Sequence, residues 1–195
     1  MFDTVLIAGL GLMGGSMAKT IKARTLSRVL GWNRTRATAE QALADGSIDA
    51  IATEALYKEA DLVIIGLYPQ ATVDWLLENM PKMKKGCVIV DMVGVKQFMV
   101  DHLEQAALDA GVHYVGGHPM AGREFSGLDY SLPTLFDGAS MIFVPTKSST
   151  ERVLEQLEAY FMSLGFGQTV RCTAQQHDHM IAFTSQLAHV VSSAY

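Results

Sequence analysis

The sequence lacks the features that mark several large classes of protein. Its 15 Lys and Arg residues are outnumbered by 20 Asp and Glu, giving a net charge of −5. The basic residues are scattered, whereas a nucleic-acid surface needs a concentrated basic face. The first apolar run breaks at Gly9, far short of a bilayer span, and no basic segment precedes it. We therefore expect no nucleic-acid or membrane partner and no targeting signal, while a small anionic ligand stays compatible with a local basic pocket.

Cysteine is scarce, and repeats and low-complexity tracts are absent. The two cysteines, Cys87 and Cys172, lie in apolar or strand-like surroundings, which favours reduced thiols over a disulfide and fits a cytoplasmic protein. With 195 residues, of which 49% are hydrophobic, the chain can bury a full core. It reads as one soluble domain with a fragment of another.

Short apolar runs alternate along the chain with segments of helical period. The predicted strands are 5–8, 29–32, 48–52, 62–65, 88–90, 114–115 and 141–144, and the predicted helices are 14–24, 36–45, 70–80, 96–110 and 150–164. Strands that are apolar at every position predict a sheet covered on both faces, and the alternation makes it mostly parallel. The fold class is therefore α/β, a doubly wound, Rossmann-like sheet.

The domain boundary is predicted near residue 172. Residues 1–172 form the dinucleotide-binding domain, and residues 173–195 have a helical pattern that begins a connecting helix. The sequence stops after Tyr195 without a Gly cap, a Pro or a polar ending. We expect the chain to end within a long helix whose continuation packs elsewhere.

A glycine-rich turn follows the first strand directly and precedes the first helix. The segment Gly9, Leu10, Gly11, Leu12, Met13 and Gly14 fits the G-x-G-x-x-G pattern. Its first glycine permits a tight turn, its second lets a pyrophosphate approach the backbone, and its third lets helix and strand pack closely. This context predicts a dinucleotide site; the alternative is a glycine turn that binds nothing.

The end of the second strand bears on the choice of cofactor. An Asp or Glu there would bind the ribose 2′-hydroxyl of NAD, but the chain has Asn33, Arg34, Thr35 and Arg36. The two arginines can pair with a 2′-phosphate and Thr35 can donate to it, so NADP is favoured. If the arginines only begin a solvated helix, NAD stays possible. No metal site is predicted.

Two more strand ends are expected at the same edge of the sheet. Leu67, Tyr68 and Pro69 follow one strand, and Gly94 and Lys96 follow the next, so both turns should line the nicotinamide half of the cleft. For Tyr68 and Pro69 a rigid loop packed on the sheet is an equal alternative. Lys96 is either a surface lysine or a contact for an anion.

The segment His118–Gly127 carries an imidazole, a carboxylate, a guanidinium and a hydroxyl between glycines, without hydrophobic periodicity. Ordering such a segment costs conformational entropy that little buried apolar surface offsets, unless a ligand binds there. His118 follows a short strand, which places it at the predicted cofactor edge. An imidazole there can accept the proton of an alcohol as hydride leaves the same carbon. The alternative is a structural histidine.

Several of these motifs together resemble the prephenate and arogenate dehydrogenases. The resemblance covers the whole chain and rests on the segments 9–16, 95–96, 117–122, Glu124, 126–127 and 177–178. It implies oxidative decarboxylation of prephenate, or of its amino analogue arogenate, on the route to tyrosine. His118 would hydrogen-bond the ring hydroxyl and assist hydride transfer to NAD(P).

The resemblance also assigns substrate contacts. It places Glu124 at the mouth of the pocket, Ser126 beside it, and His189 near the substrate on the last helix. Two positions depart from the family pattern, because Gly94 replaces a serine and Gln186 replaces a histidine. A glutamine can hydrogen-bond a carboxylate but cannot carry charge, so the choice between prephenate and arogenate stays open.

Family members carry a further all-helical domain, which implies that the full-length protein is a homodimer and that this segment alone has little activity. Two alternatives stay open. One is another β-hydroxyacid-type dehydrogenase or imine reductase, which explains the glycine turn but not the segment after His118. The other is a dinucleotide sensor without catalysis, which would fit the departures at Gly94 and Gln186.

Overall fold

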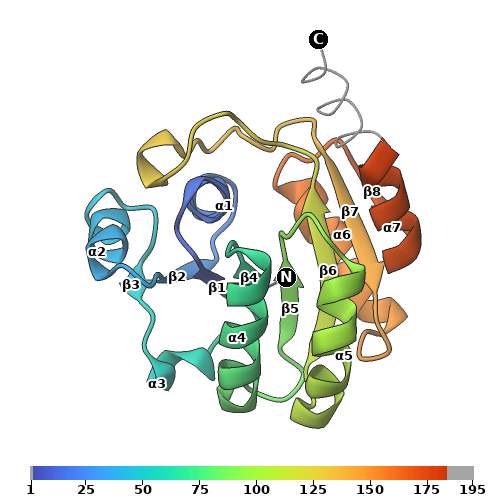
Figure 1. Ribbon diagram of the computed structural model, residues 1–195. Helices are drawn as coiled ribbons and strands as arrows, with labels where there is room; N and C mark the ends of the chain where they lie inside the picture. Colours follow the sequence, from blue (N-terminus) through green and yellow to red (C-terminus); the bar gives the residue numbers. More distant parts are fainter. Residues whose placement is uncertain (1, 184–195) are drawn as a thin grey trace.

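An eight-stranded sheet forms the centre of residues 2–183, the part of the chain that this computed structural model describes (Figure 1). The strand order is β3-β2-β1-β4-β5-β6-β7-β8, and all neighbours are parallel except the antiparallel pair β6 and β7. The strands are β1 Thr4–Ala8, β2 Arg28–Trp32, β3 Ala50–Ile51, β4 Leu62–Ile65, β5 Val88–Asp91, β6 His113–Pro119, β7 Ser140–Pro145 and β8 Gln168–Arg171.

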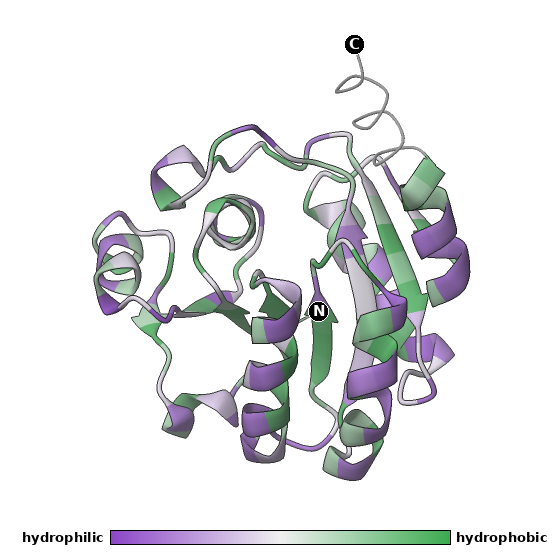
Figure 2. Ribbon diagram, viewed as in Figure 1, coloured by the Kyte–Doolittle hydropathy of each residue, from purple (hydrophilic) through white to green (hydrophobic). Residues whose placement is uncertain are grey.

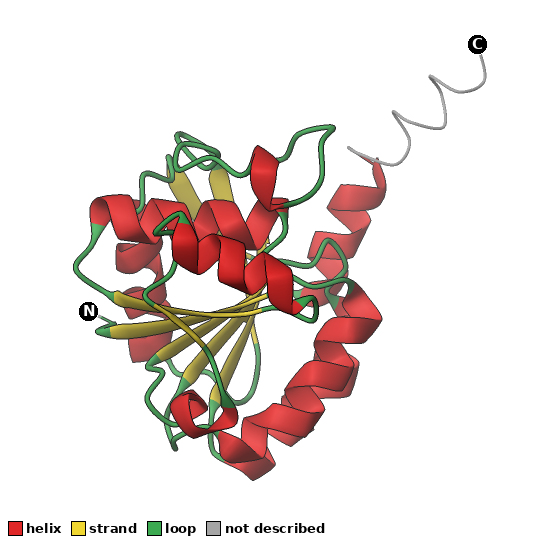
Figure 3. Ribbon diagram, turned by 90° about the vertical axis from the view of Figure 1, so that its left-hand side faces the viewer, coloured by secondary structure: helices red, strands yellow, loops and turns green. Residues whose placement is uncertain are grey.

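Helices connect the strands and cover both faces of the sheet (Figure 3). The α-helices are α1 Leu12–Arg24, α2 Arg36–Ala44, α3 Glu54–Tyr57, α4 Pro69–Asn79, α5 Gln97–Ala110, α6 Glu151–Ser163 and α7 Ala174–Ile181. Two short 3-10 helices, Met80–Lys82 and Leu128–Tyr130, lie in the connections.

Alternation along the central strands divides the core into two layers. In β1, Val5 and Ile7 pack with buried residues of α1, α2 and α6, whereas Leu6 and Ala8 pack with those of α3, α4 and α5. Successive side chains of a strand point to opposite faces, so a strand that is apolar throughout can serve both layers. Figure 2 shows the result, with hydrophobic strands inside and hydrophilic residues on the outer sides of the helices.

The predicted doubly wound, mostly parallel α/β fold is confirmed, but some elements differ. The sequence analysis missed α3 and β8; β8 lies at the edge of the sheet with mostly exposed residues and therefore has no apolar run. Strand β3 is shorter than predicted, whereas β6 continues through Gly116 and Gly117 to Pro119. Both glycines pair with β7, and position 117 requires glycine because a Cβ there would lie 2.3 Å from the Asp91 carbonyl oxygen.

The topology brings several strand ends to one edge of the sheet. Strands β1, β2, β4, β5 and β6 run in the same direction, so their carboxyl ends lie together. Helix α1, which follows β1, packs on one face of the sheet, whereas α4, which follows the neighbouring strand β4, packs on the other. In doubly wound sheets ligands bind outside such a switch point. Within residues 2–183, no helix combines the length and apolar character needed to cross a bilayer.

Candidate active site

The turn between β1 and α1 has a backbone that requires glycine at two positions. Gly9 has a φ of 93°, in the left-handed region, and a Cβ at Gly14 would lie 1.8 Å from the Gly9 carbonyl oxygen. Gly11 differs, because a Cβ there would meet nothing within 4 Å. Gly11 is also the N-cap of α1, and as a glycine it has no side chain that could cap the first N–H groups of the helix. Packing explains Gly9 and Gly14, whereas an open backbone at Gly11 suits an approaching anion.

A groove follows this turn along the carboxyl edge of the sheet. It consists of two adjoining pockets of about 440 and 260 Å³ that share Gly11, Gly66, Leu67 and Tyr68. We call the two together the edge groove. The residues predicted to bind the cofactor that line it are Gly9, Gly11, Leu12, Met13, Asn33, Arg34, Thr35, Leu67 and Tyr68. Ser126, predicted to contact the substrate, lines the smaller pocket together with Met92.

Five other residues predicted to bind the cofactor do not line the groove. Leu10 is buried in the core, and Gly14 packs against Gly9. Pro69 is the first residue of α4, where a missing N–H costs nothing. Arg36 points into solvent and pairs with Glu40 one helical turn further on, at 2.8 Å. Gly94 lies beside the imidazole of His118, as described below.

Asn33 shapes the larger pocket through two hydrogen bonds to the backbone. Its Oδ1 accepts from the Leu10 N–H at 3.0 Å, and its Nδ2 donates to the Thr35 carbonyl at 3.1 Å. The side chain therefore ties the glycine turn to the end of β2. Arg34 is the cation from this strand end that lines the groove, and Asp74 and Glu78 of α4 line the same pocket.

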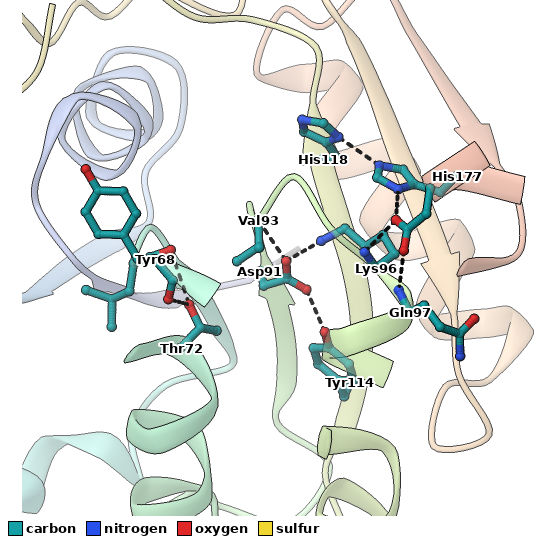
Figure 4. A network of polar contacts seen from close by, with 11 residues as sticks. Tyr68, Thr72, Asp91, Val93, Lys96, Gln97, Tyr114, His118 and His177 are labelled. Carbon is teal, nitrogen blue, oxygen red and sulfur yellow. Dashed lines mark hydrogen bonds and ion pairs between the residues drawn. The ribbon is translucent and has the colours of Figure 1, made fainter. Parts of the chain in front are cut away.

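His118 lies near the end of β6 and hydrogen-bonds a second histidine (Figure 4). The Nδ1 of His118 is 2.8 Å from the Nε2 of His177, and the Nδ1 of His177 is 2.7 Å from the Asp178 carboxylate. The other nitrogen of His118 faces the turn after β5, since a Cβ at Gly94 would lie 3.7 Å from Nε2. His118 thus has one nitrogen engaged inside the protein and one toward the turn.

Helix α7 carries His177 and Asp178 to this place. Thr173 and Gln176 form a capping box that begins the helix, and His177 in its first turn is fully buried. The sequence analysis used residues 177–178 only as part of the family motif and predicted no role for them. The capping-box residues directly before these two adjacent titratable residues could have indicated that a helix places them at the site.

The environment keeps His118 neutral at physiological pH. Burial, with smaller contributions from His177 and Lys96, lowers the pKa of His118 to about 4. Burial also lowers the pKa of His177. Both lowered pKa values favour the neutral imidazole, and a neutral His118 has the lone pair that a proton acceptor requires.

Lys96 has a different environment from the one predicted. Its side chain is fully buried and forms an ion pair with the equally buried Asp91 (Figure 4). The Tyr114 hydroxyl donates to the same carboxylate at 2.7 Å, and the Val93 N–H donates to it at 2.8 Å. The ammonium is thus used inside the protein and does not lie on the surface of the groove. The predicted substrate contact for Lys96 is replaced by a structural role beneath the His118 site.

The loop after β6 carries the remaining predicted substrate residues. Glu124 and Ser126 are exposed, and Glu124 does not line the edge groove. Next to them, the Phe125 and Tyr130 rings stack with centroids 4.8 Å apart. Gln186 and His189 lie outside the residues that the structure describes.

A family model and a curated relative both match this chain to the prephenate dehydrogenases. The family model described as "Prephenate dehydrogenase, nucleotide-binding domain" matches residues 17–168. A prephenate dehydrogenase of Bacillus subtilis is 33% identical over all of this chain and 53% of its own length. The chain therefore spans about half the length of that relative.

Solved structures agree with the sequence match. The prephenate dehydrogenase of Aquifex aeolicus, in complex with hydroxyphenyl propionate and NAD+, superimposes with a TM-score of 0.89 at 27% identity, covering 100% of this chain and 68% of that one. An arogenate dehydrogenase of Synechocystis gives a TM-score of 0.88 at 26% identity, covering 98% and 67%.

Proposed function

This chain belongs to the prephenate dehydrogenase family, and on that basis we propose that it supplies the nucleotide site and the proton acceptor of a cyclohexadienyl dehydrogenase. Residues 1–172 would be the dinucleotide-binding domain, with a helical segment following. The reaction would be the oxidative decarboxylation of prephenate to 4-hydroxyphenylpyruvate. Arogenate is the second candidate substrate, favoured by the likeness to the Synechocystis arogenate dehydrogenase.

One observation carries this proposal. His118 presents its Nε2 toward the turn after β5, at the sheet edge whose groove is lined by the glycine turn. A nicotinamide dinucleotide, when bound, supplies the hydride acceptor. His118 would take the proton of the ring hydroxyl as the carbon bearing it loses hydride. The bond to the departing carbon dioxide would then supply the electron pair that makes the ring aromatic, and the ring oxygen would take back a proton. Ser126 would face the substrate from the smaller pocket.

The residues fit a dinucleotide. Gly11 has an open backbone at the start of α1, and the groove runs from Asn33 past Tyr68 to Met92. We propose a preference for NADP, supported by the missing carboxylate at the end of β2 and by Arg34 in the groove. Arg36 adds little support because it pairs with Glu40. Binding of NAD stays compatible with the carboxylates Asp74 and Glu78 in the same pocket.

The test uses the intact protein with prephenate and arogenate and follows the absorbance of the reduced cofactor. His118→Asn keeps a hydrogen-bonding side chain but removes the base, so kcat should fall about 100-fold or more with cofactor affinity unchanged. His102→Asn, on the exposed side of α5, is the matched control. An unaltered kcat in His118→Asn would remove this residue from the mechanism.

The same assay separates the alternatives. A dinucleotide sensor would bind the cofactor tightly and turn over neither cyclohexadienyl acid. Another β-hydroxyacid-type dehydrogenase would oxidise simple 3-hydroxy acids instead. Homodimerisation of the intact protein and substrate contacts by Glu124, Gln186 and His189 stay predictions of the family resemblance. A cytoplasmic location stays a prediction from the two reduced cysteines.

A further inference from the structure

A series of hydrogen bonds links His118 to the start of α5. Asp178 accepts from the Lys96 N–H at 2.7 Å and from the Gln97 N–H at 2.9 Å, where α5 begins. The same carboxylate meets the Nδ1 of His177, whose Nε2 meets the Nδ1 of His118. Figure 4 shows His118 and His177 side by side above Lys96 and Gln97.

The carboxylate at the inner end of this series is held in its ionised form. Burial raises the pKa of Asp178, but hydrogen bonds from the Gln97 N–H, His177 and the Lys96 N–H outweigh this, and the pKa is lowered overall. The N-terminus of α5 also favours a negative charge. An ionised carboxylate can only accept hydrogen bonds, so Asp178 requires that the Nδ1 of His177 carry a proton.

The direction of each further bond follows from this requirement. A neutral imidazole has one N–H and one lone pair, so His177 with a proton on Nδ1 must accept at Nε2. The Nδ1 of His118 then has to be the donor, and its Nε2 retains the lone pair. We propose that His177, held by Asp178, is a positioning residue that fixes His118 as the tautomer whose basic Nε2 faces the turn at Gly94.

This inference rests on the proposed function for its catalytic meaning but not for its geometry. The charged and titratable groups that face His118 are His177 and Asp178 from α7, Lys96 from the start of α5 and Asp91 from β5. Lys96 and Asp91 form an ion pair with each other, and neither hydrogen-bonds His118. His177 is therefore the contact among these four that can select the tautomer.

Two substitutions of His177 test the assignment. His177→Phe keeps a ring of similar size but removes both hydrogen bonds. His177→Gln restores them, because a glutamine amide can donate to Asp178 and accept from His118. His102→Phe, which removes an exposed imidazole bonded only to the Phe98 carbonyl, is the control.

The first readout is the ¹⁵N NMR spectrum of the imidazoles in this chain near pH 7, without substrate. In the unsubstituted protein and in His177→Gln, the Nε2 of His118 should have the shift of a nitrogen without a proton, whereas His177→Phe should give a mixture of tautomers. A proton on Nε2 in the unsubstituted protein, or an unchanged spectrum in His177→Phe, would overturn the proposal.

The second readout is turnover by the intact enzyme. We expect kcat to fall about tenfold or more in His177→Phe, with KM for the cofactor unchanged, and to recover in His177→Gln. An unchanged kcat in His177→Phe would also overturn the proposal. If His118→Asn leaves turnover intact while the spectra are as expected, the catalytic assignment fails and the tautomer assignment stands. The two failures are thus distinguishable.

Discussion

The glycine turn allows a test in which two similar substitutions have different consequences. Gly11→Ala and Gly14→Ala each add one methyl group to the same motif. A Cβ at Gly14 would lie 1.8 Å from the Gly9 carbonyl oxygen, whereas a Cβ at Gly11 would meet nothing within 4 Å. The structure therefore predicts that Gly14→Ala affects folding and that Gly11→Ala affects cofactor binding.

The magnitudes come from opposing contributions. At Gly14, which lies in the first turn of α1, helix propensity alone would make alanine more stable by up to about 1 kcal/mol. Overpacking against a backbone oxygen costs about 3 kcal/mol, since neither backbone can yield as a flexible side chain would. We expect a net loss of about 2 kcal/mol. At Gly11 the backbone has an ordinary φ of −75°, so the free energy of unfolding should change by no more than about 0.5 kcal/mol.

Urea unfolding followed by circular dichroism measures the first effect. Quenching of tryptophan fluorescence on cofactor titration measures the second, because Trp32 and Trp75 both line the groove. Gly11→Ala should weaken cofactor binding about tenfold or more, or about 1.4 kcal/mol. A Gly14→Ala protein as stable as the unsubstituted one would refute the packing argument. Unchanged affinity in Gly11→Ala would refute the assignment of the pyrophosphate to this turn.

Three further predictions concern the edge of the sheet. A Cβ at Gly94 would make ordinary van der Waals contact with His118, so the Gly94→Ser protein should fold normally and place a hydroxyl near Nε2. We expect its kcat/KM to rise about two- to tenfold in steady-state assays, whereas Gly94→Ala should show no rise. Arg34→Ala should weaken NADP about tenfold and NAD little in binding titrations, while Arg36→Ala should affect neither. Because the pKa of His118 is lowered to about 4 from 6.5, the unfolded chain binds more protons between these values, and stability must fall as pH falls. We expect urea unfolding to show a loss of about 1 to 2 kcal/mol from pH 7 to 5, allowing for solvent screening. His118→Gln should lack this part of the loss, and the same pH dependence in both proteins would contradict its assignment to His118.

Local patterns in the sequence were sufficient to predict much of the fold. Fully apolar strands such as Leu62–Ile65 and the glycine turn depend on neighbours close in sequence, and both were identified. Strand β8 was missed because an edge strand with exposed residues has no apolar signal. The predicted strand ended at residue 115, before the glycines of β6, because the crowding at Asp91 that requires Gly117 comes from another strand.

The site was predictable only where its residues follow strand ends. The position of His118 at the carboxyl edge could be inferred from its own strand. The burial of Lys96 could not, because it depends on a partner in β5 and on the packing around both side chains. The contact between His118 and His177 joins residues 59 positions apart and needs the complete arrangement of β6, β7, β8 and α7.

The position of β8 at the edge of the sheet has a consequence for the dynamics of the site. His118 lies in β6, but its partner His177 lies in α7, the helix that follows this edge strand. The residues of β8 are mostly exposed, and such segments open locally at a lower free energy than buried strands. Local opening of β8 and α7 would separate His177 from His118 without unfolding the buried strand β1, and hydrogen exchange in β8 would measure how often this happens.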